Sequence, residues 1–401
     1  MKSIKSFMAA TSVALILFSC EKNIQDPAKD EVVTLKTTPT NLQSKKGTAG
    51  YVYTLSNQTT GNKVLVYSRT SEGILSYVTA YPTGGTGTAT GLGNQGAITL
   101  SGNSDGHRSD GDHNDGNHDN DLLLAVNPGS NSVSSFKVSG NGLQWVSTVF
   151  SGGTTPVSVT VQNNLVYVLN SGGSGNISGF RLHDDGSLHP IANSTRPLSS
   201  ASAGAAQVSF VADGNAIAIT EKATNKIITY TINSQGIPGM MHSITSAHPT
   251  PFGFAVGGNG NIFVSEAAGG APGASALSSY HINDNGTIAL VDGPVGANQT
   301  AACWVVVTSN GKYAYTTNTG SNNLSTFKVN SLGSISVLNA ISATTETGPI
   351  DAALSNNSKF LYVLNSGSHS IGVYAVANNG SLSSVQTVSG LPVGATGLAA
   401  K

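Results

Sequence analysis

Residues 101 to 121 hold the densest set of metal-ligating side chains in the sequence. Six aspartates and three histidines alternate there with glycine, serine and asparagine. Carboxylate oxygens suit calcium, and imidazole nitrogens suit a transition metal. The candidate ligands in the middle of the run are Asp110, Asp112, His113 and Asp115. This pattern raises the possibility of a weak divalent-metal site.

The spacing within this run fits a calcium-binding loop poorly. Counted from Asp110, the position that requires glycine holds Asp115, and no glutamate closes the loop. A solvated loop without a ligand is the alternative, because doubling a loop's length costs only about 0.6 kcal/mol. We favour that alternative. No resident cofactor is therefore expected, and any calcium or other divalent metal would be bound weakly.

Composition and the remaining motifs exclude several classes of function. The chain contains no His-Glu-x-x-His motif and no phosphate-binding glycine loop before a helix. Lysine and arginine number 19 against 20 acidic residues, which gives a net charge of −1. Because nucleic-acid binding relies on a surplus of positive charge, a nucleic-acid partner is not expected.

The N-terminus has the pattern of an export signal. Lys2 and Lys5 precede an apolar stretch from 7 to 18, and Ser19 stands before Cys20. Residues 1–19 are predicted to be a lipoprotein signal peptide, with Cys20 as the lipidated residue and residues 20–49 as a flexible tether. An ordinary signal peptide with an incidental cysteine is the alternative. The prediction is a protein held at the bacterial cell envelope through a lipid anchor alone.

Residues 50–401 consist of a repeated unit that supplies the elements on which any site must stand. One copy reads Tyr-Val-Leu-Asn at 167–170, Ile-Ser-Gly-Phe at 177–180 and Asp-Gly-Ser-Leu at 185–188. The aromatic residue of the third strand recurs seven times, at Tyr67, Phe136, Phe180, Tyr230, Tyr280, Phe327 and Tyr374. The intervals are 44 to 50 residues except for one of 69, which is the range of propeller blades.

These units predict an all-β fold, a seven-bladed β-propeller. Alternating apolar residues and Asn-Gly or Asp-Gly turns make short antiparallel strands, and a blade must stack on its neighbours to bury both faces. The long interval is explained by the run at 101–121, a loop between the first two strands of the second blade. The first unit lacks an inner strand, and residues 391–399 match one, so the C-terminus is expected to close the ring. A closed ring has no free sheet edge, which favours a monomer.

The repeat resembles that of the lactonase family of seven-bladed propellers, which includes bacterial 6-phosphogluconolactonase and fungal carboxymuconate lactonizing enzyme. The likeness covers nearly all of residues 50–401. It implies lactone hydrolysis at one mouth of the central channel, with histidine and arginine at the starts of inner strands and a glutamate after a second strand.

Carried over residue by residue, the resemblance leaves few of those groups in place. The family's Gly-Pro-Arg-His aligns with Gly-Ala-Ala-Gln at 204–207, so Gln207 stands in place of histidine. Its Pro-Arg-Gly-Phe aligns with 251–254, where Phe252 replaces arginine. Glu221 keeps its match, with a solvated or paired carboxylate at the rim as the alternative. His248 and Lys222 are candidate substitutes for the lost groups, and for His248 a plain loop histidine is the alternative. Glu221, Gln207 and His248 are therefore the candidate catalytic residues.

Two functions of different classes follow. The first is an envelope-anchored scaffold that binds a ligand or partner and has lost most of the family's catalytic set. The second is a lactone hydrolase with a rearranged site around Glu221. The partner is expected to be a small-molecule lactone, a glycan or an envelope protein. We favour the scaffold, because losing one oxyanion donor typically costs about 3–4 kcal/mol of transition-state stabilisation.

Overall fold

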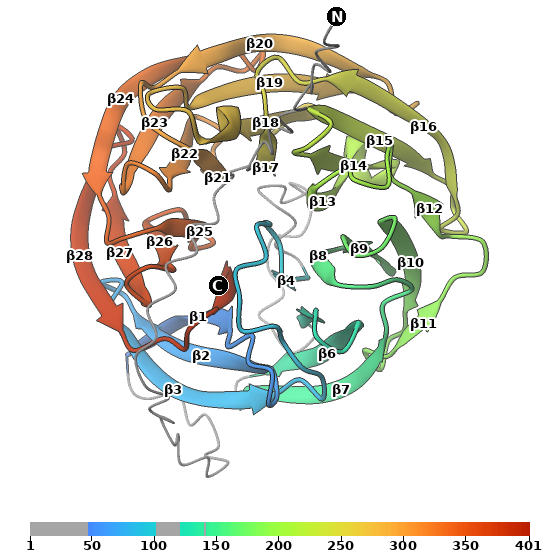
Figure 1. Ribbon diagram of the computed structural model, residues 1–401. Helices are drawn as coiled ribbons and strands as arrows, with labels where there is room; N and C mark the ends of the chain where they lie inside the picture. The colour runs from blue at the N-terminus through green and yellow to red at the C-terminus, as the bar shows by residue number, and fades with distance from the viewer. Residues whose placement is uncertain (1–46, 102–120, 140–141) are drawn as a thin grey trace, which may run out of the picture.

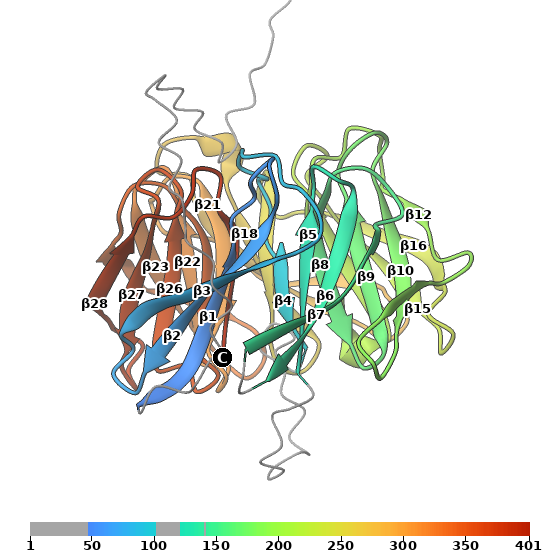
Figure 2. The ribbon, with the colours of Figure 1, turned by 90° about the horizontal axis from the view of Figure 1, so that it is seen from below.

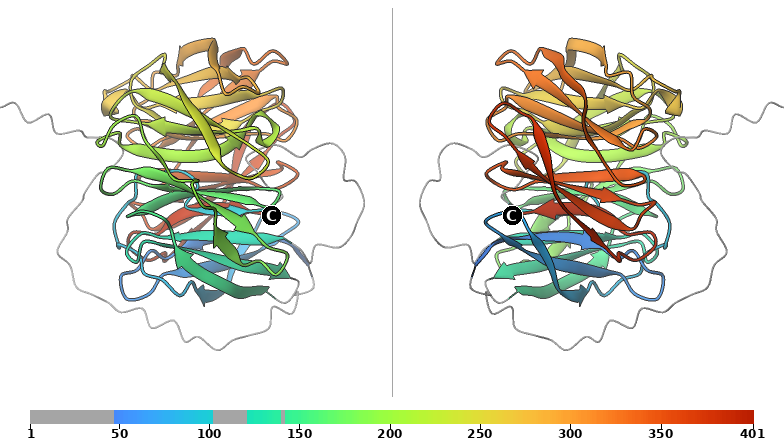
Figure 3. Two further views of the ribbon diagram at one scale, coloured as in Figure 1. Left: turned by 90° about the vertical axis from the view of Figure 1, so that its right-hand side faces the viewer. Right: turned by 90° about the vertical axis from the view of Figure 1, so that its left-hand side faces the viewer.

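Seven antiparallel sheets stand in a ring around a central channel, as the repeat predicts (Figure 1). The computed structural model describes residues 47–101, 121–139 and 142–401. Each sheet has four strands, and the third adds a fifth, β12 (Arg196–Pro197), which pairs with β10. Figures 2 and 3 show the blades side by side in the ring. The seven-bladed β-propeller prediction is confirmed.

The strands fall into four concentric sets. The inner strands line the channel: β29 (Thr396–Ala400), β4 (Ile98–Leu100), β8 (Pro156–Gln162), β13 (Ala205–Val211), β17 (Pro251–Val256), β21 (Ala302–Val307) and β25 (Pro349–Leu354). The second strands are β1 (Thr48–Leu55), β5 (Leu122–Asn127), β9 (Leu165–Asn170), β14 (Ala216–Glu221), β18 (Asn261–Glu266), β22 (Tyr313–Asn318) and β26 (Phe360–Asn365).

The outer two sets complete each blade. The third strands are β2 (Lys63–Thr70), β6 (Ser132–Ser139), β10 (Asn176–Leu182), β15 (Lys226–Ile232), β19 (Ala276–Ile282), β23 (Asn323–Val329) and β27 (Ser370–Val376). The outer strands are β3 (Leu75–Pro82), β7 (Gly142–Phe150), β11 (Leu188–Pro190), β16 (Pro238–Thr245), β20 (Ile288–Gly296), β24 (Ile335–Thr344) and β28 (Leu382–Ser389). Two short 3-10 turns, η2 (Ala212–Gly214) and η3 (Ala268–Gly270), occur in the described residues.

The hydrophobic core lies between neighbouring blades, because strand alternation turns one apolar face of each sheet to the next. Between the fourth and fifth blades, for example, Ala218 and Ile227 belong to one buried cluster with Phe254 and Val264. Buried tyrosines also link blades: the hydroxyl of Tyr167 donates to the carbonyl of Gly236 in the next blade, at 2.7 Å. Each blade therefore depends on its neighbours for burial.

The C-terminus closes the ring. β29 pairs with β1, with Ala400 opposite Val52 and Leu398 opposite Thr54. It supplies the inner strand that the first unit lacks, so the predicted closure is confirmed. The strand itself covers 396–400, whereas the sequence match covered 391–399. Residues 391–395 form the connection that leads into the strand.

The acidic insertion joins β4 to β5, the predicted place between the first two strands of the second blade. The candidate metal ligands Asp110, Asp112, His113 and Asp115 lie outside the described residues, as does Cys20. The described part of the chain has no group of three or more His, Cys, Asp or Glu side chains placed to hold a metal ion. No helix in that part is long and apolar enough to cross a membrane.

Candidate functional site

The channel has two ends with different side chains. The inner strands all begin at one end, where the antiparallel second strands finish; we call this end the starting mouth. The inner strands finish at the other end, which we call the far mouth. The resemblance to lactonases places their chemistry at the starting mouth, with Glu221 at the end of β14 and Gln207 near the start of β13.

The Glu221 carboxylate is fully buried and accepts hydrogen bonds from Ser199 and Thr224. Its Oε1 accepts a hydrogen bond from the backbone N–H of Ser199, at 2.8 Å. Its Oε2 accepts one from the hydroxyl of Thr224, at 2.6 Å, and another from the hydroxyl of Ser199. These contacts fix the connection that enters the fourth blade to the end of β14.

Glu266 occupies the same position one blade on, with a similar set of donors. The hydroxyls of Ser246 and Ser278 each donate to its carboxylate at 2.6 Å, and the backbone N–H of His248 donates at 3.0 Å. Tyr280 adds a bond of 3.2 Å. The carboxylate thus joins the second strand, the third strand and the connection from the preceding blade.

This position is a structural element of the repeat. In every blade except the first, the second strand ends on a fully buried Asn or Glu: Asn127, Asn170, Glu221, Glu266, Asn318 and Asn365. The asparagines make the same kind of contact; the Asn127 amide, for example, donates to the hydroxyl of Ser134 at 2.7 Å. The surroundings of Glu221 therefore fit a carboxylate that holds strands together, and its catalytic role stays a prediction.

The stability contribution of Glu266 is expected to depend on pH. Burial raises the pKa of its carboxyl above the ordinary value of 4.5, against the lowering effect of the hydroxyl and N–H donors. A raised pKa means that the folded chain holds this proton more tightly than the unfolded chain. The stabilisation is therefore present below pH 4.5 and is lost as the pH rises through the folded-state pKa.

Glu266→Gln has no carboxyl to ionise at this position. We therefore expect the melting temperature of Glu266→Gln minus that of the unmodified protein to increase as the pH rises from about 4 to about 7. Ser246→Ala is the matched control, because it removes one donor and keeps the carboxyl, so its pH dependence should remain. Melting curves of Glu266→Gln and the unmodified protein that run parallel over this range would contradict the expectation.

Gln207 acts as a link between inner strands. Its side chain is buried, its Nε2 donates to the carbonyl of Phe254 at 2.9 Å, and its Oε1 accepts from the N–H of Phe254 at 2.7 Å. The amide therefore joins β13 to β17 and has both its polar atoms engaged. His248 lies elsewhere, with its Nε2 3.0 Å from the carbonyl oxygen of Ala274 and its backbone on Glu266. The bonds of the three predicted residues thus go to three different sets of partners.

The starting mouth is filled by the chain itself. Residues 92–96, which we call the plug segment, belong to the connection between β3 and β4 and cross the centre of the ring (Figure 1). Asn94 and Gln95 are 2% and 7% exposed. The one sequence signal for this segment is the length of the connection from 83 to 97, which links neighbouring blades.

The plug segment bonds to the inner strands of three blades. The N–H of Gln95 donates to the carbonyl of Ala206 at 3.1 Å, and its Nε2 donates to that of Val305 at 3.1 Å. The indole N–H of Trp304 donates to the carbonyl of Asn94 at 2.7 Å. The Asn94 amide donates to the carbonyl of Val157. The plug segment is therefore fixed across the channel.

Aromatic packing occupies the place where the resemblance expects an arginine. Phe252 is fully buried, and its ring centroid lies 4.9 Å from that of Trp304. The ammonium of Lys222 lies 4.5 Å from the Phe252 centroid and donates to the carbonyl of Gly93 in the plug segment, at 2.5 Å. This cation thus supports the plug segment.

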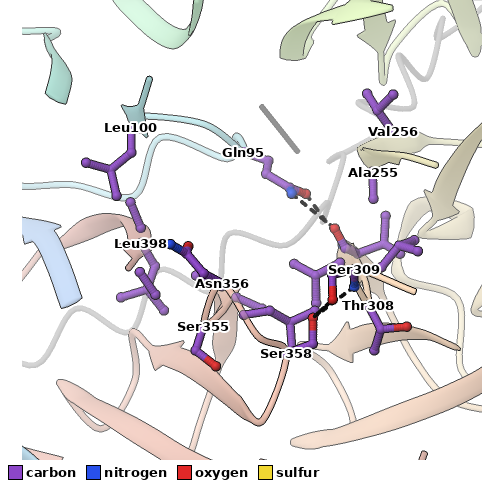
Figure 4. Close-up of a pocket in the computed structure, with 18 of the residues that line it drawn as sticks. Gln95, Leu100, Ala255, Val256, Thr308, Ser309, Ser355, Asn356, Ser358 and Leu398 are labelled. Atoms are coloured by element: carbon purple, nitrogen blue, oxygen red, sulfur yellow. Dashed lines mark hydrogen bonds between the residues drawn. The ribbon is translucent and has the colours of Figure 1, made fainter. Parts of the chain in front are cut away.

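A cavity of about 580 Å³ occupies the channel on the side of the far mouth. Its walls come from the inner strands β4, β17, β21, β25 and β29 and from the turns that follow three of them, and Gln95 of the plug segment lines its inner end. Figure 4 shows Leu100 and Leu398 facing Ala255 and Val256 across it. Sequence reasoning missed this cavity, because its Ser, Thr and Asn residues have the composition of ordinary turns.

Comparison with known proteins supports the fold. No family model matches the sequence, and no curated protein does. A periplasmic gluconolactonase from Pseudomonas aeruginosa superposes with a TM-score of 0.62 at 16% identity, over 87% of this chain and 99% of that one. A protein from Bacteroides fragilis described as a candidate 6-phosphogluconolactonase gives 0.65 at 15%, over 88% and 98%. A Lactobacillus plantarum protein gives 0.66 at 18%, over 88% and 99%. The chain shares the seven-bladed propeller fold of these proteins along their whole length.

Proposed function

We propose that this protein is an envelope-anchored propeller that binds a ligand and does not hydrolyse lactones at its starting mouth. One observation carries the proposal: the plug segment fills that mouth, with Asn94 and Gln95 buried there and bonded to three blades. A hydrolase needs room for its substrate beside the groups that react with it. The cavity on the other side of the plug segment has room for a bound ligand.

The side chains at the starting mouth support the same conclusion. Lactone opening needs a group that stabilises the developing oxyanion and a base that activates water. The aligned positions hold Ala206, Gln207 and Phe252, and the Gln207 amide is committed to Phe254. Glu221 already accepts three hydrogen bonds, two from Ser199 and one from Thr224. A substrate would have to displace several of these contacts.

Attachment to the envelope is the part of the proposal that rests on sequence alone. Residues 1–19 have the pattern of an export signal, and Cys20 follows it directly. Two or more acyl chains suffice for stable attachment without a membrane-spanning helix. Mass spectrometry of the mature protein is expected to find Cys20 acylated at the N-terminus, and an unmodified Cys20 in the mature chain would contradict the anchor.

The experiment is an assay of lactone hydrolysis by the purified domain. 6-Phosphogluconolactone and unphosphorylated sugar lactones are incubated with the protein and with Glu221→Gln. We expect no turnover above the spontaneous rate from either, and a lower melting temperature for the variant because Ser199 and Thr224 lose a charged acceptor. Size-exclusion chromatography and thermal melting serve as controls for folding.

Lactone hydrolysis by a rearranged site around Glu221 is the second candidate, favoured by the shared fold with the Pseudomonas aeruginosa gluconolactonase. The same assay decides between the two. Turnover that falls in a folded Glu221→Gln would establish the hydrolase and overturn the proposal that the starting mouth does not hydrolyse lactones.

A further inference from the structure

The far-mouth cavity has the size and lining of a small-molecule site. Ligand pockets commonly enclose several hundred cubic ångströms and combine apolar walls with a few polar groups. Here the cavity holds about 580 Å³ and has walls that include Ile98, Leu100, Val256, Val307 and Leu398. This inference rests on the proposed binding function and names the class of ligand.

The polar part of the lining comes from two neighbouring turns. Residues 308–311 follow β21, and residues 355–358 follow β25. The turns are tied together, because the N–H of Ser309 donates to the hydroxyl of Ser358 at 2.9 Å, and that hydroxyl lies 3.2 Å from the hydroxyl of Ser309. Hydroxyls and amides thus stand in a fixed arrangement on one side of the cavity (Figure 4).

The charge of the lining selects against anionic ligands. Among the described residues that line the cavity, Asp351 is the one ionisable side chain, and none is Lys, Arg or His. A phosphate or carboxylate inside this space would be desolvated without a cation beside it. An uncharged ligand meets no such penalty.

One amide in these turns has an acceptor that the protein does not use. Asn356 Oδ1 is buried and makes no hydrogen bond within the described part of the chain. Its neighbours differ: Asn310 Oδ1 accepts from Thr308 at 2.8 Å, and Asn357 Oδ1 accepts from Ser355 at 2.9 Å. Asn356 lines the cavity, so a small rotation of its side chain would present this unused acceptor to a ligand that carries a hydroxyl donor.

We infer that the far-mouth cavity binds a neutral sugar, one or two units long, with Asn356 Oδ1 accepting a hydrogen bond from a sugar hydroxyl. The C–H faces of a sugar ring match the aliphatic walls, and its hydroxyls match the amides and hydroxyls of the two turns. The described lining residues include no lysine, arginine or histidine, which separates this ligand from a sugar phosphate.

Isothermal titration calorimetry and saturation-transfer NMR test the inference with glucose, N-acetylglucosamine, maltose and glucose 6-phosphate as probes. At least one neutral sugar is expected to bind, and glucose 6-phosphate is expected to bind at least tenfold more weakly than glucose. Asn356→Ala should weaken neutral-sugar binding about tenfold. Asn356→Leu should abolish it while filling the space. Asn285→Ala, in the exposed turn between β19 and β20, is the matched control and should bind as the unmodified protein does.

The outcomes separate this inference from the proposed function. Absence of binding by every neutral probe, equal binding of glucose 6-phosphate, or an unchanged affinity in a folded Asn356→Ala would each overturn the sugar site. None of these results bears on lactone hydrolysis, which is measured separately. Turnover in the lactonase assay would overturn the proposed function, whereas sugar binding that depends on Asn356 would still support the site.

Discussion

A chain that ends before residue 396 is expected to lose cooperative folding. The deletion removes β29, the inner strand of the first blade, and leaves the edge of β1 unpaired from Val52 to Leu55. It also removes Leu398, Ala399 and Ala400, which are buried against neighbouring blades. Since blades bury their faces only against one another, an open ring exposes apolar surface and a strand edge that can recruit other chains.

Thermal melting and size-exclusion chromatography check this prediction. The shortened chain should show no sharp transition and should elute as aggregate. Lys401→Ala is the matched control, because it keeps the backbone of the closing strand and removes only the ion pair with Asp121. The side chain of Lys401 is 18% exposed and that of Asp121 is 33% exposed. A partly exposed pair contributes under about 1 kcal/mol, so this variant should melt close to the parent. A shortened chain that melts like the parent would refute closure by β29.

Gly253→Ala is expected to destabilise the fold by about 1–3 kcal/mol through the plug segment. A Cβ at this position would lie 2.0 Å from Oε1 of Gln95 and 2.9 Å from the carbonyl oxygen of Cys303. The first contact forces the Gln95 side chain away from Val305, whose N–H and carbonyl it bonds. Chemical denaturation measures the change in the free energy of unfolding.

A double-mutant cycle with Gln95→Ala shows whether the effect runs through the plug segment. Gln95→Ala alone should destabilise by about 1–3 kcal/mol, because buried polar groups of Val305 lose their partner. In the double variant the clash with Oε1 is gone. Its loss in the free energy of unfolding should therefore be about 1 kcal/mol smaller than the sum of the losses in the two single variants. Strict additivity would mean that Gly253 and Gln95 do not meet as described.

The plug segment shows why the shared fold does not settle the function of this chain. A fold can carry many functions, and function depends on the site that is built on it. In this chain the mouth at which the resemblance expects the chemistry holds Phe252 packed against Trp304, whose indole N–H donates to Asn94 of the plug segment. The space left for a ligand is on the other side of Gln95.

Much of the fold could be predicted from the sequence because the relevant interactions are local and repeated. Strand alternation, Asn-Gly turns and the recurrence from Tyr67 to Tyr374 determine blades and their number. Closure of the ring could also be predicted. The first unit lacks an inner strand, and the residues near the C-terminus match one, so they can pair with the edge that would otherwise be free. The asparagine or glutamate that ends the second strand of six blades was also visible, as in Asn170 and Glu221, but its hydrogen-bond partners were not.

The site could not be predicted, because it depends on contacts between residues far apart in the chain. Gln95 bonds Val305, 210 positions away, and no local pattern indicates that residues 92–96 cross the channel. Asn356 and Asn357 are the same residue type side by side in one turn. In the folded chain Asn357 Oδ1 accepts a hydrogen bond from Ser355, whereas Asn356 Oδ1 has no partner among the described residues. The sequence by itself thus determined a closed seven-bladed ring, and its resemblance to the lactonases predicts that most of their catalytic side chains are missing. Only the tertiary structure decided which mouth is filled and where a ligand has room, because packing across the channel brings together segments that the repeat does not relate.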